Sequence, residues 1–276
     1  MNDVSADKEV VSTCAAKLAE AEATRRPTAP LTETFPALNL NDAYRIQQAN
    51  VQRRTRRGER IVGHKVGLTA KAMQDLFGVH EPDYGHVLDT MVHDRRAPLN
   101  LSELIDPQIE VEPAFLLGRR LAGPGVTVRD VLAATEYVST CFEVIDSRIV
   151  DWRVRIQDTV ADNGSSARVV LGSQQLKPSA LALEDLETVL ELDGAVVATG
   201  STSAILGHPA NGVAWLANTL ARFGTALEAG DLVLPGTCTR CFRLLGRRSA
   251  TGRIAGLGEV TIALENAPFV TNPKTS

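Results

Sequence analysis

The stretch QIEVEPAFLLG, residues 108–118, has the apolar composition of a buried strand but carries Glu110 and Glu112. Side chains in a strand alternate between its two faces, so both carboxylates point to one side and Ile109 and Val111 to the other. Two like charges that close repel each other, and burying either one alone is costly. The pair is therefore expected to be exposed, protonated or neutralised by a cation.

A third glutamate, Glu143, lies in the middle of a second apolar, strand-like segment, STCFEVIDSRI at residues 139–149. An isolated Glu-x-Glu pair is most often an exposed acidic face, and Pro113 is typical of an edge strand. Hard divalent cations such as Mg²⁺, however, prefer oxygen ligands. The third carboxylate favours a site in which all three acids hold one metal ion.

Length and composition exclude several classes of protein. The chain has 276 residues, of which 44% are hydrophobic and 22% charged, with 29 basic against 33 acidic residues. This charge balance does not indicate the basic face of a nucleic-acid-binding protein. The short basic cluster at residues 53–57 is typical of a solvated helix end. The sequence also lacks a membrane-spanning run and a signal-peptide core, so we expect a cytoplasmic protein without a membrane partner.

The four cysteines are expected to be reduced in that compartment. Cys238 and Cys241 form a C-x-x-C motif, but the sequence offers no second ligand pair for zinc. We interpret them as buried or half-buried thiols.

Hydrophobic periodicity divides the chain into two regions. Helical spacing covers residues 7–22 and 41–57, and short β-like runs dominate from residue 61 onward. Thr127 and Pro209 are predicted to begin two further helices, and Asp193-Gly194 predicts a hairpin. We predict an α+β protein with a helical N-terminal region, residues 1–62, and a β-rich catalytic domain, residues 63–276.

Two further segments are candidates for the same site. Lys65 lies between Gly63 and Gly67 in an apolar run, where it is either an ordinary snorkelling lysine or a group that binds an anion or moves a proton. Ser165 and Ser166 belong to a polar turn, DNGSS, which is typical of structural turns but could also hold a carboxylate through hydroxyl and backbone N–H groups.

In chain order, the segments GHKVGLT, EPDYG, IEVEPAFLL, FEVIDSRIVDW, DTVADNGSS and LGHP resemble the fumarylacetoacetate hydrolase superfamily. The similarity is greatest to the branch of 2-hydroxypenta-2,4-dienoate (2-keto-4-pentenoate) hydratases and 4-oxalocrotonate decarboxylases. It covers about residues 39–224 and returns at AGLGEVTIAL, residues 255–264. The resemblance implies a mixed β-roll or barrel-like body with a small helical N-terminal region, and a homo-oligomer that is often built of pentamers.

The resemblance also implies the roles of the candidate residues. Mg²⁺ or Mn²⁺ would be held by Glu110, Glu112 and Glu143 and would chelate the C1 carboxylate and C2 oxygen of a 2-oxo or 2-hydroxydienoic acid. Lys65 would neutralise the carboxylate or shuttle protons, and Asp83, unless it is only a turn residue, would handle the proton or water at the distal carbon. The expected substrate-binding residues are Leu68, Ser165, Ser166 and Arg240.

Three functions remain open at this point. The leading hypothesis is a metal-dependent hydro-lyase that adds water to a 2-hydroxydienoic acid and forms a 4-hydroxy-2-oxo acid through a metal-stabilised enolate. The second is a decarboxylase of a 2-oxo diacid such as 4-oxalocrotonate. The third is an inactive scaffold or partner subunit, which the unusual loop around Cys238 favours mildly. His208 precedes a helix that begins with proline, so capping is expected rather than catalysis.

Overall fold

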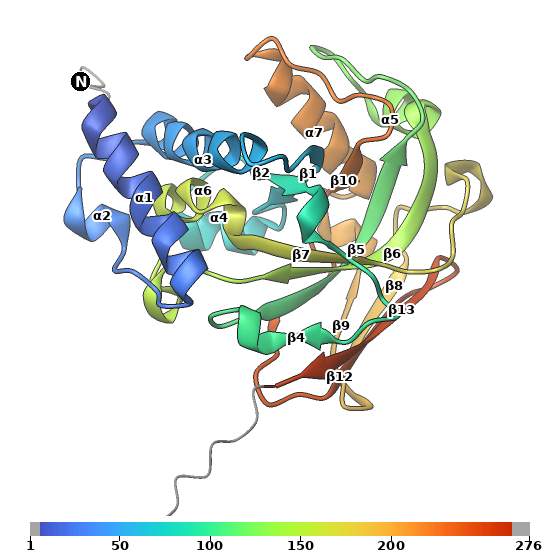
Figure 1. Cartoon of the computed structure of the whole chain (residues 1–276). Coiled ribbons are helices and arrows are strands. Elements are labelled where there is room, and N and C mark those ends of the chain that lie inside the picture. Colours follow the sequence, from blue (N-terminus) through green and yellow to red (C-terminus); the bar gives the residue numbers. More distant parts are fainter. Residues whose placement is uncertain (1–5, 267–276) are drawn as a thin grey trace, which may run out of the picture.

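The computed structural model describes residues 6–266 and has two β-sheets with helices packed around the larger one (Figure 1). The larger, eight-stranded sheet has the order β2-β1-β10-β5-β6-β7-β3, with β11 paired to β5. The five-stranded sheet has the order β4-β13-β12-β8-β9. The α+β class with mixed sheets, predicted from the sequence, is confirmed.

The larger sheet is mixed, because some of its neighbouring strands run parallel and others antiparallel. Its strands are β1 (Ile61–Gly67), β2 (Asp83–Leu88), β3 (Val92–His93), β5 (Gln108–Leu117), β6 (Thr135–Ile145), β7 (Ser166–Leu171), β10 (Leu232–Leu234) and β11 (Phe242–Arg243). The smaller sheet consists of β4 (Leu99–Asn100), β8 (Glu187–Leu192), β9 (Ala195–Ser201), β12 (Ser249–Ile254) and β13 (Gly258–Glu265). The predicted hairpin at Asp193-Gly194 joins β8 to β9.

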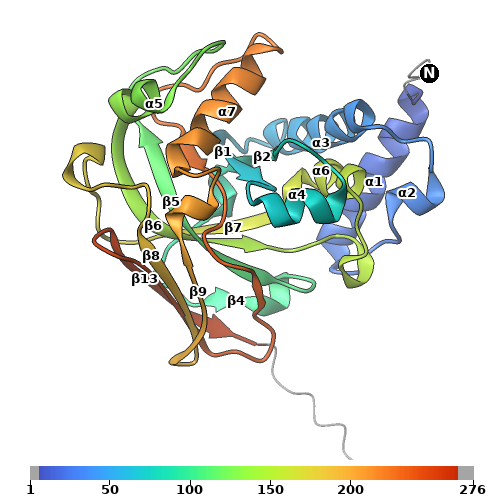
Figure 2. The same cartoon turned by 180° about the vertical axis from the view of Figure 1, so that it is seen from behind.

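Several of the helices begin where the sequence provides a capping side chain. α1 (Lys8–Thr24), α2 (Leu31–Thr34) and α3 (Leu40–Thr55) precede β1 and gather at one side of the molecule (Figure 2). α5 (Val128–Ala134) follows the capping box of Thr127 and Asp130. α7 (Pro209–Ala221) begins after His208, whose Nδ1 accepts a hydrogen bond from the Ala210 backbone N–H, so the predicted capping role is confirmed. α4 (Lys71–Phe77) and α6 (Ile156–Ala161) lie near the functional site.

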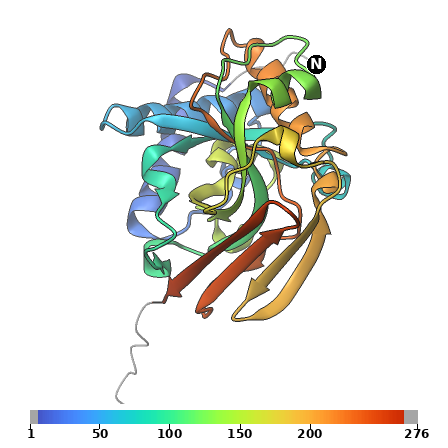
Figure 3. The ribbon, with the colours of Figure 1, turned by 90° about the vertical axis from the view of Figure 1, so that its right-hand side faces the viewer.

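The main core fills the space between the two sheets, whose separation is visible from the side in Figure 3. Val111 and Phe142 of the larger sheet are fully buried there, and Ile262 of the smaller sheet is 1% exposed. A Cβ atom on Gly252 of β12 would lie 2.7 Å from the Phe142 ring, so the sheets approach closely at this point. The apolar face of β5 and β6 is thereby used for the core, and their other face is left for polar side chains.

Pro113 does not lie on an edge strand, because β5 is central and pairs with β6 along nearly its whole length. On its other side, however, β5 pairs with β11 at Gln108 and Ile109 and with β10 at Phe115 and Leu116. Pro113 falls in the gap between these partners. The proline, which has no backbone N–H to donate, is tolerated because β5 is locally unpaired there.

Candidate metal centre

Three glutamates meet on the polar face of β5 and β6. The register places Glu110 directly opposite Glu143, while Glu112 lies two residues along the same face. Each of the three offers one carboxylate oxygen, and these oxygens all lie within 4.8 Å of one another. A single cation can therefore contact all three.

Two of the acids are buried and Glu110 is half-buried, contrary to the exposed face that an isolated Glu-x-Glu pair suggests. Glu143 is 0% and Glu112 1% exposed, and neither oxygen of Glu143 has a hydrogen-bond partner among the described residues. Burial and the charge of Glu143 raise the pKa of Glu110 to about 7, and burial raises that of Glu112 well above its usual range. Unpartnered, crowded oxygens of this kind fit a hard divalent cation, which would restore the ionised forms.

Lys65 lies at the edge of the acid cluster. Its Nζ is 3.6 Å from Glu143 Oε2 and donates a hydrogen bond of 3.1 Å to the Gly164 carbonyl. Burial alone would lower the pKa of Lys65, but Glu143, Asp83 and the other acids raise it above its usual value. Lys65 is therefore a fixed cation beside the acids and not a snorkelling surface lysine.

The turn before β7 positions Lys65 through its backbone. Gly164 has φ +59°, and a Cβ atom there would lie 3.1 Å from Lys65 Cδ, so a side chain is disfavoured for both reasons. The adjacent Asn163 side chain is hydrogen-bonded to both the N–H and the carbonyl of His86. The turn is thus tied to β2 while it presents its carbonyl to the lysine.

Asp83 begins β2 and lies beside Lys65. It is 3% exposed, and its Oδ1 has no hydrogen-bond partner within residues 6–266. Burial raises its pKa, which Lys65 partly offsets. Its cross-strand partner is Gly67, and a Cβ at Gly67 would clash with Asp83 Oδ1. The glycine allows the carboxylate to approach the lysine.

These groups border a cavity of about 180 Å³. Of the predicted site residues, the cavity is lined by Lys65, Leu68, Asp83, Glu110, Glu112 and Ser165. Glu143 is not among the lining residues and has no exposed surface. Ser166 begins β7 and does not line this cavity, and its Oγ has no hydrogen-bond partner among the described residues. Arg240 is not among the lining residues, and its guanidinium lies 4.7 Å from the centre of the Phe242 ring.

Several residues at the site have no counterpart in the sequence prediction. The Gly236 backbone N–H donates a hydrogen bond of 2.9 Å to Glu112 Oε2, and Cys241 Sγ donates to Gln108 Oε1 at 2.9 Å. The prediction of half-buried thiols is consistent with Cys241, which lines the cavity and is free. Only a loop that returns from residue 236 brings these groups to β5, and no local pattern signals such a return.

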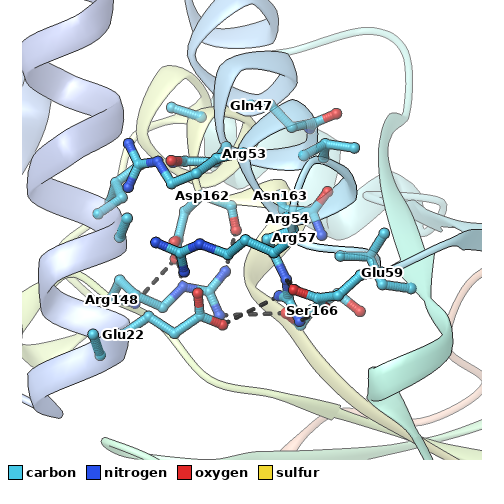
Figure 4. A pocket seen from close by; sticks show the side chains of 17 residues that line it. Glu22, Gln47, Arg53, Arg54, Arg57, Glu59, Arg148, Asp162, Asn163 and Ser166 are labelled. Carbon is cyan, nitrogen blue, oxygen red and sulfur yellow. Dashed lines mark hydrogen bonds and ion pairs between the residues drawn. The ribbon is translucent and has the colours of Figure 1, made fainter.

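A second cavity, of about 260 Å³, lies between α1, α3 and the opposite side of the turn before β7 (Figure 4). Arg148 and Asp162 form a buried ion pair there, at 2.5 Å. Arg148 also donates a hydrogen bond to the Asp146 carbonyl, while the Asp146 carboxylate accepts hydrogen bonds from the backbone N–H groups of Ile105 and Asp106. The Arg148–Asp162 pair anchors the segment that continues to Gly164.

Comparison with known proteins identifies the family to which the chain is similar. Residues 87–265 match the family model of the fumarylacetoacetate (FAA) hydrolase C-terminal domain. The chain is 45% identical over 233 residues to 2-hydroxyhexa-2,4-dienoate hydratase of Comamonas testosteroni, covering 84% of this chain and 88% of that protein. It is 46% identical over 221 residues to 2-hydroxypent-2,4-dienoate hydratase of Pseudomonas putida, covering 80% and 100%.

The fold is also similar to a solved structure, 4-oxalocrotonate decarboxylase from Pseudomonas putida G7 complexed with magnesium and adipate. The TM-score is 0.91 at 35% identity, with 95% of this chain and 99% of that chain covered. Another structure of that decarboxylase contains calcium and acetate. In the described part of the chain, no helix is both long and apolar enough to span a bilayer.

Proposed function

The chain belongs to the fumarylacetoacetate hydrolase family, and on that premise we propose how its cavity hydrates a 2-hydroxydienoic acid. Relatives named as hydratases match over 80% or more of the chain, and it is accordingly a hydratase, a metal-dependent hydro-lyase. The observation that carries the assignment of the site is the convergence of three carboxylates within 4.8 Å beside a cavity that Lys65 also lines.

The reaction requires two proton movements and one addition. The 2-hydroxyl proton of the dienol is lost and a proton is added at C5, which gives a 2-oxo-3-enoic acid. Water then adds across the new double bond, with its oxygen bonding to C4 and a proton to C3, and the product is a 4-hydroxy-2-oxo acid. Both steps pass through an enolate, so a group that accepts electron density at the C2 oxygen serves both.

Glu110, Glu112 and Glu143 would hold the divalent cation, which supplies a Lewis acid toward the substrate carboxylate and C2 oxygen. We propose Mg²⁺, with Mn²⁺ as the alternative, because all three ligands are hard carboxylate oxygens. Similar structures contain magnesium or calcium.

Lys65 and Asp83 act on the substrate directly in this proposal. The Lys65 ammonium, fixed by Gly164 and Glu143, attracts the anionic end of the substrate and stabilises negative charge at its C2 oxygen. Asp83 lines the same cavity and has a free oxygen, so it is the candidate for moving the proton or orienting the water at the far carbons. Leu68 and Ser165 line the path of the substrate.

A spectroscopic assay tests the proposal. With Mg²⁺, the protein is expected to remove the ultraviolet absorbance of a 2-hydroxydienoate and to form a 4-hydroxy-2-oxo acid, and EDTA should abolish the activity. Because the 35% identical structural neighbour is a decarboxylase, decarboxylation of a 2-oxo diacid is the second candidate, and released CO₂ would identify it. Failure to turn over any 2-oxo or 2-hydroxydienoic acid with Mg²⁺ or Mn²⁺ would favour a scaffold or partner subunit.

The assembly and location of the protein remain predictions. The prediction of a homo-oligomer built of pentamers can be tested by light scattering, which measures the mass of the assembly that the purified chain forms. The same experiment with and without Mg²⁺ would reveal whether the assembly depends on the metal.

A further inference from the structure

We propose that the substrate carries no charge at its far end, so that the enzyme prefers monocarboxylic dienoates and discriminates against diacids. This inference rests on the proposed function and concerns the part of the cavity beyond the metal centre.

The ionisable groups of the cavity form one cluster. Glu110 and Glu112 lie with Glu143 at the metal centre, Lys65 is 3.6 Å from Glu143, and Asp83 adjoins the lysine. Among the lining residues that the structure describes, Lys65 is the single cation. It is already engaged by these acids and by the Gly164 carbonyl, at the end where the substrate's first carboxylate binds.

The remainder of the lining is predominantly apolar. Trp152 is its largest side chain, and its only polar atom, Nε1, donates to the Asp106 carbonyl at 3.1 Å and is therefore not available to a ligand. Burial raises the pKa of the Cys241 thiol to about 11, so this group is neutral as well. The apolar lining residues are Val66, Leu68, Ala70, Phe77, Ile145, Trp152 and Val154, and the polar ones outside the ionisable cluster, Thr69, Gln108, Thr159, Ser165 and Thr237, are all uncharged.

The basic residues of the segments that flank the cavity do not provide a positive charge for a second substrate carboxylate. None of them lines the cavity as far as the described residues extend, and each is exposed or has another partner. Arg153 pairs with Glu33 at 3.2 Å, Lys71 pairs with Asp75 at 2.6 Å, Arg240 lies over the Phe242 ring, and Arg155 is exposed.

A second carboxylate at the far end would therefore lose its water without gaining an ion pair. Burying an unpaired charge is far more costly than burying a methyl group, which this lining would favour. We expect kcat/KM for a diacid to be lower than for the matched monoacid by a factor on the order of 100 or more. Most of this difference should appear in KM, because the far end does not react.

The test compares two substrates with the full-length, Mg²⁺-loaded enzyme: 2-hydroxyhexa-2,4-dienoate and 2-hydroxyhepta-2,4-diene-1,7-dioate. Val154→Arg adds a cation to the apolar lining, and Val154→Met adds comparable length without charge. The arginine variant should raise kcat/KM for the diacid by tenfold or more relative to the methionine variant, and lower it for the monoacid.

The outcomes separate the two proposals. Wild-type preference for the monoacid supports the inference. Equal or better hydration of the diacid by the wild type overturns it but leaves the hydratase function intact. Absence of turnover with both dienoates overturns the proposed function itself. Because the comparison of substrates uses the wild type, the inference stays testable even where a variant fails to fold.

Discussion

Replacing Glu110 with Gln removes one of three negative charges that lie within 4.8 Å of one another, without changing the size of the side chain. In the absence of metal this charge is unfavourable, because burial and Glu143 raise the pKa of Glu110. With metal the same charge is a ligand. The substitution should therefore stabilise the metal-free protein and weaken its response to Mg²⁺.

The magnitude follows from the pKa of Glu110, which rises from 4.5 to about 7 in the folded protein. Such a shift corresponds to about 3 kcal/mol, which we reduce to about 2 kcal/mol because Glu110 is partly exposed. For an acid whose pKa is raised in the folded state, the loss of folding stability is absent below the pKa of the unfolded chain, near 4.5. The loss grows as the pH rises and is complete above the folded-state pKa of about 7. At pH 8 the metal-free variant should be more stable by about 2 kcal/mol.

Urea unfolding at pH 8, with EDTA and with Mg²⁺, measures both effects. Mg²⁺ at about 100 times its dissociation constant stabilises the wild type by about 2.7 kcal/mol. If loss of one ligand weakens binding by about 100-fold, the variant gains only about 0.4 kcal/mol at the same concentration. The advantage of the variant in EDTA should thus disappear in Mg²⁺.

Glu136→Gln serves as the control, since Glu136 is an exposed glutamate near the start of β6, the strand that pairs with β5. It should change neither the stability in EDTA nor the gain with Mg²⁺. The reasoning would be refuted by a Glu110→Gln protein that is less stable than wild type in EDTA, or by one that retains the full stabilisation by Mg²⁺.

Three further results are expected. Lys65→Met should lower kcat by about 10²–10⁴-fold while Mg²⁺ affinity, measured by calorimetry, stays equal or rises; weaker Mg²⁺ binding would contradict the assigned role. Gly164→Ala, at φ +59° and 3.1 Å from Lys65 Cδ, should cost about 1 kcal/mol in urea unfolding and lower kcat; unchanged kinetics would show that the turn does not position the lysine. Burial lowers the pKa of His64 to about 3 and of His86 to about 4, so stability should fall as the pH drops below about 6.5, by about 2 kcal/mol for each at pH 5, and a double Gln variant should flatten this pH dependence.

The sequence by itself determined the class of the fold and the strand face on which Glu110 and Glu112 lie. The alternation of side chains in a strand places Glu110 and Glu112 on one face whatever surrounds them, and Thr127 and His208 begin their helices through contacts within a few residues. Such local rules are readable because they depend on spacing along the chain alone. The resemblance of six separate motifs to the fumarylacetoacetate hydrolase superfamily predicted the family, and the comparisons confirm it.

The tertiary structure alone decided how these segments meet. The register of β5 against β6 places Glu143 opposite Glu110, and a shift by one residue would have turned it to the core face. The Gly236 N–H, the carbonyl of Gly164 and the apolar lining around Trp152 and Val154 come from segments far apart in sequence. Their positions depend on long-range pairing and packing, whose energies are spread over many weak contacts and leave no short pattern in the chain.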